Sequence, residues 1–129
     1  MQTNKRMSLN SNVNFLLSLQ IQMKICHWQT KGIARHEAFG GFYSDLDPLI
    51  DDFVEQSMGK YGRFILDEET NTIQLKNLSE IDIKGLVNTV RDVLVQMTEE
   101  IDPKDTNLLN LRDEILGLVN KYSYLFTME

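Results

Sequence analysis

Apolar residues recur at helical spacing along most of the chain. Positions i, i+3, i+4 and i+7 of one face of an α-helix point the same way, so this repeat predicts amphipathic helices that share a core. Four such segments are separated by residues typical of helix ends. The four predicted helices run from the N-cap candidates Ser8, Asn10 and Ser11 to Lys31-Gly32, from about Ala34 to Tyr61, from Ile83 to Asp102-Pro103, and from Asp105 or Thr106 to the end of the chain.

Two segments leave alternatives open. Pro48 lies inside the second helical pattern, where it either kinks one helix or starts a new one with Asp47 as N-cap; we favour one kinked helix. Residues 64–80 alternate β-branched and polar residues around Asn71, which suits an extended connection as well as a helical turn. The sequence therefore predicts an all-α, ferritin-like four-helix bundle with a long connection between helices two and three.

Length and composition favour one domain. The chain has 129 residues, of which 42% are hydrophobic, so we expect a single domain over 1–129 with residues 1–8 as a flexible tail. No apolar run reaches membrane-spanning length, no secretory leader is evident, and Cys26 is the lone cysteine; these features predict a cytoplasmic protein that binds no membrane. The net charge of −6 disfavours DNA binding, which relies on Lys and Arg at phosphates.

The candidate chemistry lies in both histidines and two later carboxylates. His27 and His36 flank a short connection that contains Gly32, while Asp51 and Glu55 are four residues apart and share a helix face. On one helix, His36 and Asp51 lie about 22 Å apart at 1.5 Å per residue, so one ion cannot contact both. A second copy related by a two-fold axis would bring the two halves together. The spacing therefore predicts metal sites between the subunits of a homo-oligomer built from two-fold dimers.

Two imidazoles and two carboxylates suit Fe(II), Zn(II) or Mn(II). In this hypothesis His27 and His36 are neutral nitrogen ligands, Glu55 bridges two ions, and Asp51 binds terminally. An ordinary explanation stands beside it, because such residues also occur as packed histidines and as a solvated acidic face. No nucleophile elbow, phosphate loop or Cys-x-x-Cys motif indicates another enzyme class.

The segment HWQTKGIARHEAFGGF, with Asp51 and Glu55 behind it, resembles the Dps-like mini-ferritins. The resemblance implies iron binding and storage, with a ferroxidase reaction in which peroxide or dioxygen oxidises Fe(II). It also implies that Gly40 stands where that family has a further aspartate ligand, and that Trp28 captures stray oxidising equivalents. Judged from the residues alone, Trp28 is instead an aromatic anchor in the core.

Three short segments, HWQTK, ARH and GKYGR, also resemble sequences of an uncharacterised group of small ferritin-like proteins from large phages. That resemblance implies no activity. It supports a second hypothesis for function: a non-enzymatic phage helical bundle that acts as a scaffold or host-interaction protein, without a working metal site.

Overall fold

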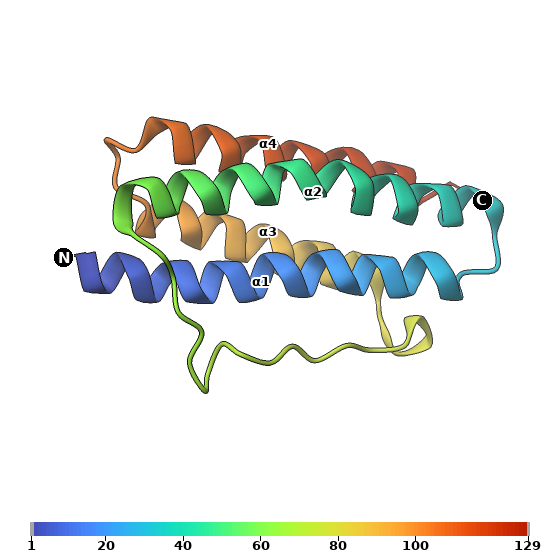
Figure 1. Ribbon diagram of the computed structural model, residues 1–129. Helices are drawn as coiled ribbons and strands as arrows, with labels where there is room; N and C mark the ends of the chain where they lie inside the picture. The colour runs from blue at the N-terminus through green and yellow to red at the C-terminus, as the bar shows by residue number, and fades with distance from the viewer. Residues whose placement is uncertain (1, 129) are drawn as a thin grey trace.

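A computed structural model describes the backbone of residues 2–128 and the side chains of residues 9–128. Its regular structure is helical throughout the described part: α1 (Gln2–Gln29), α2 (Ile33–Tyr61), a short 3-10 turn η1 (Leu78–Glu80), α3 (Ile83–Glu100) and α4 (Thr106–Leu125). Figure 1 shows the four long helices side by side. The predicted all-α four-helix bundle with a long second connection is confirmed.

The direction of the helices follows from the lengths of their connections. Short turns make α1 and α2 antiparallel neighbours, and likewise α3 and α4, whereas the long segment after α2 crosses the bundle before α3 begins (Figure 1). The two pairs join mainly where α2 packs on α4. The core comes from the predicted apolar stripes and includes the fully buried side chains of Leu16, Phe39, Leu46, Leu94 and Ile115.

The sequence predicts the course of α2 correctly, including Pro48, but not the start of α1. α1 begins at Gln2, so the N-cap predicted at Ser8, Asn10 or Ser11 is wrong and the backbone of residues 2–8, expected as a tail, is helical. α2 runs through Pro48 without a restart, as favoured. It ends at Gly62, whose φ of 89° is accessible to glycine and whose N–H donates to the carbonyl of Met58.

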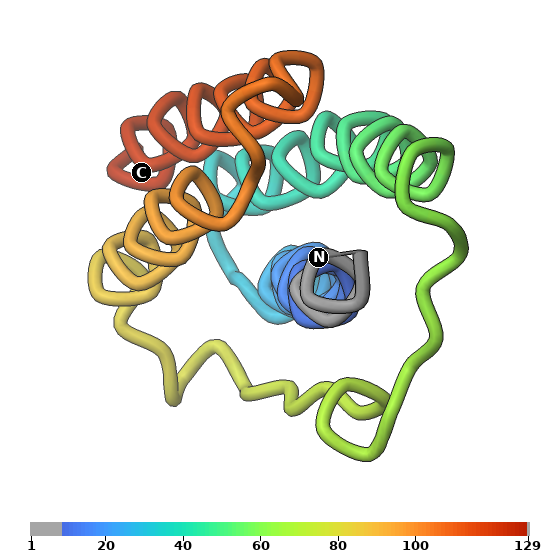
Figure 2. The backbone as a smooth tube through the Cα atoms, turned by 90° about the vertical axis from the view of Figure 1, so that its left-hand side faces the viewer, coloured from blue at the N-terminus to red at the C-terminus, as the bar shows by residue number. Residues whose placement is uncertain are grey.

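Residues 62–82, which we call the strap, enclose α1. Figure 2 looks along the helices and shows α1 with the other three helices on one side and the strap on the other. The strap is extended apart from a turn at residues 68–71 and the 3-10 turn η1. Its backbone would lose hydrogen bonds to water against a helix unless polar groups of α1 replaced them.

Amide side chains of α1 supply those bonds. Asn14 donates to the carbonyls of Thr70 and Thr72 at 3.0 and 2.7 Å. Gln22 pairs with Lys76 in both directions: its Nε2 donates to the Lys76 carbonyl, and its Oε1 accepts from the Lys76 N–H, each at 2.9 Å. Gln29 binds η1, where its Oε1 accepts from the Leu78 N–H at 2.7 Å. A polar face of α1 is thus covered by the chain itself.

Candidate functional site

His27 and His36 form a stacked pair at the turn between α1 and α2. Their ring centroids are 3.9 Å apart, with 23° between the planes. The Nδ1 of His27 lies 2.7 Å from the carbonyl oxygen of His36, and the Nδ1 of His36 lies 2.8 Å from that of His27. Because a carbonyl oxygen only accepts, both Nδ1 atoms carry their proton and donate. The histidine side chains are therefore brought together, as the sequence predicts.

These bonds have a structural effect. The carbonyl of His27 lies in the last turn of α1, where carbonyl groups lack a partner within the helix, and the His36 ring supplies one. The reciprocal bond ties the His27 ring to the first turns of α2. The pair therefore fastens the α1–α2 corner. A neutral ring protonated at Nδ1 keeps an unprotonated Nε2, the atom that would remain for a metal.

Gly40 has a packing role. A Cβ placed on Gly40 would come within 2.8 Å of both Nδ1 and Cε1 of His27, closer than any ordinary contact. The His27 ring thus occupies the space in which a side chain at position 40 would stand. The aspartate ligand that the ferritin resemblance expects at position 40 would have no room there while His27 keeps this place.

Asp51 and Glu55 lie one turn apart on the same face of α2, as their spacing predicts, and both are exposed. Because α2 is one helix, the rise of about 1.5 Å per residue keeps them some 22 Å or more along it from His36. Among the described residues no group of three or more His, Cys, Asp or Glu side chains could hold a metal ion. Metal binding at His27, His36, Asp51 and Glu55 between two copies stays a prediction.

Two neighbours of His27 have opposite environments. Cys26 is fully buried, as expected of a core residue, and burial raises the pKa of its thiol. Trp28 is 65% exposed, so its interpretation as an aromatic anchor in the core is wrong. Its ring lies beside the ammonium of Lys24, 5.3 Å from the ring centroid, and that ammonium also lies 4.6 Å from the Tyr43 ring.

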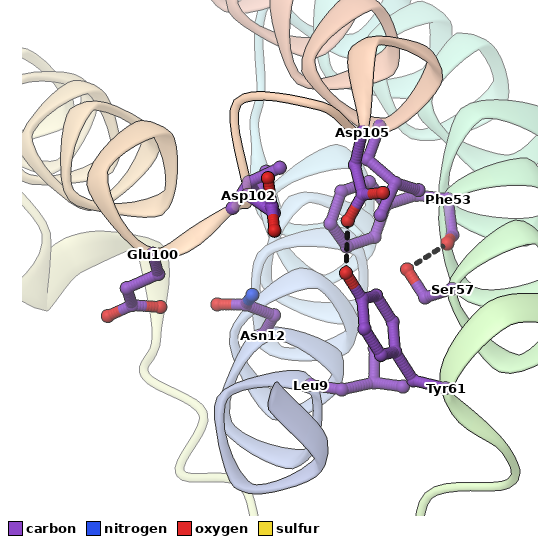
Figure 3. Close-up of a pocket in the computed structure, with 10 residues that line it drawn as sticks. Leu9, Asn12, Phe53, Ser57, Tyr61, Glu100, Asp102 and Asp105 are labelled. Atoms are coloured by element: carbon purple, nitrogen blue, oxygen red, sulfur yellow. Dashed lines mark hydrogen bonds between the residues drawn. The ribbon is translucent and has the colours of Figure 1, made fainter. Parts of the chain in front are cut away.

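A polar cluster joins the opposite end of the bundle. The buried carboxylate of Asp105, at the N-cap of α4, accepts hydrogen bonds from Lys60 and Tyr61 at the end of α2. The bond to Asp105 raises the pKa of Tyr61. Figure 3 shows Tyr61 pointing to Asp105 across a cavity of about 30 Å³ that Leu9 and Phe53 also line. Such a cavity has space for a water molecule or two, so we interpret the cluster as a structural link.

A much larger groove runs between α1, α3 and the strap, with a volume of about 580 Å³. It exists because α1 packs closely on α2 and only sparingly on α3. Its floor contains the buried side chains of Leu19 and Val90. Its apolar walls come from residues that are only half-buried: Phe15, Ile81, Leu86 and Val93. Groove volume and lining are typical of sites that bind a ligand or an apolar part of another molecule.

Sequence reasoning missed this groove. Leu19 is buried against the chain's own core at the bottom of the groove. The sequence does hold a signal for the strap, which forms one wall of the groove: the row of amide residues Asn14, Gln22 and Gln29 on α1. Amides spaced along a helix indicate that backbone, which carries unpaired donors and acceptors, lies on that face.

Comparison with known proteins places the chain in a family. A family model described as a family of unknown function (DUF5856) matches residues 27–126. The chain belongs to this family. It is also similar to an uncharacterised 14.6 kDa protein in the mobD-ri intergenic region of Enterobacteria phage T4, with 27% identity over 128 residues. That similarity covers 99% of this chain and 94% of the relative. No solved structure matches the chain significantly.

These findings correct the assignment to the Dps-like mini-ferritins. The family that matches spans HWQTKGIARHEAF and both carboxylates, and it is a different family, so the ferritin resemblance was carried by a short segment alone. The similarity to a phage protein agrees with the phage part of the second resemblance and not with its ferritin-like part. No helix in the described part of the chain is long and apolar enough to cross a membrane.

Proposed function

We propose that the protein is a non-enzymatic, phage-type helical bundle that binds another protein, encoded by the phage or by its host, through the groove between α1 and α3. The observation that carries this proposal is the groove itself: a mostly apolar opening of about 580 Å³ between α1, α3 and the strap. In this proposal the protein acts in the host cytoplasm, and the stacked histidines hold the α1–α2 corner in place.

Two further observations support the proposal. The T4 relative is similar over nearly its whole length, so the shared unit is the complete bundle and not an isolated segment. The walls of the groove are apolar side chains at half-buried positions, and a concave, mostly apolar opening of this volume is typical of sites that bind another molecule.

Site-specific photo-crosslinking tests the proposal. A photoreactive residue replaces Thr89, which lines the groove, and in a second variant it replaces Val95, which is 55% exposed on the same helix and does not line the groove. Irradiation of infected host cells should join one discrete protein to the Thr89 variant and not to the Val95 variant. Identical products from both variants, or none from Thr89, would contradict the proposal.

A further inference from the structure

We propose that the occupant of the groove is a basic amphipathic helix of the partner protein, laid between α1 and α3 with its apolar face inward and its Lys or Arg residues at the rim. This inference rests on the proposed function and adds the chemistry of the partner to it. The shape of the groove indicates a helix, and the charge of its rim indicates basic residues.

Shape favours a helix that runs along the bundle. On α3 the lining positions Gly85, Leu86, Thr89, Val90 and Val93 follow the three- and four-residue spacing of one helix face. On α1 the lining positions 15, 18, 19 and 22 do the same. Each helix thus contributes a row of lining side chains about two turns long, and rows of this kind form grooves in which the side chains of another helix interdigitate. An occupant needs apolar residues at i, i+3 or i+4, and i+7 to fill it.

Small residues at the mouth give the occupant access. Gly85 has no side chain, and Thr89 is exposed with its hydroxyl donating to the Gly85 carbonyl at 3.1 Å. The carboxylate of Asp82 lies beside Gly85, where an added Cβ would come within 3.0 Å of its Oδ2, so the small exposed residue that leaves the mouth open is Thr89. A bulky residue at Thr89 would close this entrance without changing the core.

Charge favours a basic partner. The exposed carboxylates of Glu80 and Asp82 lie at one end of the groove. Asp92, also exposed, comes three residues after Thr89 and so lies beside it on α3. Lys76 supplies the positive charge among the lining residues, and the chain as a whole carries −6. Carboxylates that outnumber cations at the rim attract a partner with Lys or Arg there and repel an acidic one.

Two synthetic peptides test the partner's chemistry directly. Both are fluorescein-labelled 14-residue helices with leucine at i, i+3, i+4 and i+7; the remaining positions are lysine in one peptide and glutamate in the other. Fluorescence anisotropy with the full-length protein measures each dissociation constant at low and at physiological salt. We expect the lysine peptide to bind one per chain and at least tenfold more tightly than the glutamate peptide.

Matched variants separate groove binding from general attraction to an acidic protein. Thr89→Trp should weaken binding of the lysine peptide at least tenfold, whereas Val95→Trp should leave its affinity unchanged. Of these two positions, Thr89 lines the groove and Val95 does not. The pair Glu80→Gln and Asp82→Asn should weaken binding of this peptide several-fold and reduce its salt dependence. The pair Glu68→Gln and Glu69→Gln removes the same charge from an exposed turn of the strap outside the groove and should have a smaller effect.

Each contrary result overturns the inference in a distinct way. Equal binding to the Thr89→Trp variant would mean attraction to the acidic surface alone. Tighter binding of the glutamate peptide would reverse the chemistry of the partner. If neither peptide binds, but an apolar dye binds the wild type and not the Thr89→Trp variant, the groove holds a small apolar molecule. If neither peptide binds but Thr89 still crosslinks a discrete protein in cells, the proposed function stands and the basic helix does not.

Discussion

Gly40 and His27 share a space that admits one side chain. Because a Cβ at position 40 would come within 2.8 Å of the His27 ring, Gly40→Ala should move the ring and weaken the α1–α2 corner. We expect a loss of about 1–3 kcal/mol, the usual effect of overpacking. Urea denaturation followed by circular dichroism measures it.

The control for Gly40→Ala is Gly117→Ala in α4, where a Cβ meets nothing within 4 Å. That change should stabilise the protein by up to about 1 kcal/mol through helix propensity. A double mutant cycle with His27→Ala should recover most of the cost of Gly40→Ala, since the clashing ring is gone. An unchanged cost in the His27→Ala background would show that the ring is not the cause.

His36 stabilises the corner through its bond to the His27 carbonyl and through ring stacking. His36→Ala should therefore lower the free energy of unfolding by about 1–2 kcal/mol, the range for a lost hydrogen bond at a helix end. Glu37→Ala, at the exposed neighbouring position, should have little effect. If the pair acts without metal, EDTA will leave the melting temperature of the wild type unchanged; a clear drop would favour the metal hypothesis instead.

Tyr122 gives the protein a measurable response to alkaline pH. Burial, together with the bond in which its hydroxyl donates to Asp45 at 2.7 Å, raises the pKa of Tyr122 to about 12. An unfolded tyrosine titrates near about 10, so the folded state holds the proton more tightly. This contribution to stability is complete below about pH 10 and disappears as the pH rises from about 10 to about 12.

Unfolding curves from pH 8 to 11.5 test the Tyr122 effect. Tyr122→Phe removes the titrating group, so the stability of the wild type should fall toward that of the variant as the pH rises. The ring itself should still pack against Phe42 and Phe126 in the variant. A difference between the two proteins that stays constant over this pH range would contradict the assignment.

At the scale of the elements, α1 and the strap depend on each other. Gln22 exchanges two hydrogen bonds with the backbone of Lys76, so Gln22→Ala should free the middle of the strap. Amide hydrogen exchange should rise over residues 72–80 while the helices remain protected. The exposed Gln96→Ala on α3 serves as control. Faster exchange throughout α1 and α2 would mean that the strap also supports the bundle.

The helices were predictable because their burial follows from local spacing. The apolar stripe of α2, with Phe39, Leu46 and Phe53, fixes its buried face whatever the rest of the chain does. The end of α2 at Gly62 and the end of α3 shortly before Pro103 follow from backbone chemistry. The start of α1 was not predictable in this way, since capping residues such as Ser8 and Asn10 also occur inside helices when tertiary contacts favour it.

The candidate site was predictable only in part. The short connection placed His27 beside His36, as the sequence indicates. What the rings do there depends on the carbonyls within reach, and the groove depends on how far α1 and α3 stand apart. Both are properties of packing between distant segments, which single-chain spacing does not contain.

At the scale of the whole molecule, two helical hairpins meet through α2 and α4, and the strap is the covalent link between them. Each hairpin consists of neighbours in sequence, whereas the bonds between α1 and the strap described above join residues 49 to 58 positions apart. Closing so long a segment costs more chain entropy than forming either hairpin.

The enclosure of α1 therefore sets an order of events in time. The hairpins are expected to assemble first and the strap to close over α1 after the rate-limiting step. In stopped-flow experiments Gln22→Ala should then speed unfolding and leave the folding rate nearly unchanged. A slower folding rate would instead place the strap in the folding nucleus, so that the strap would be among the first segments to form.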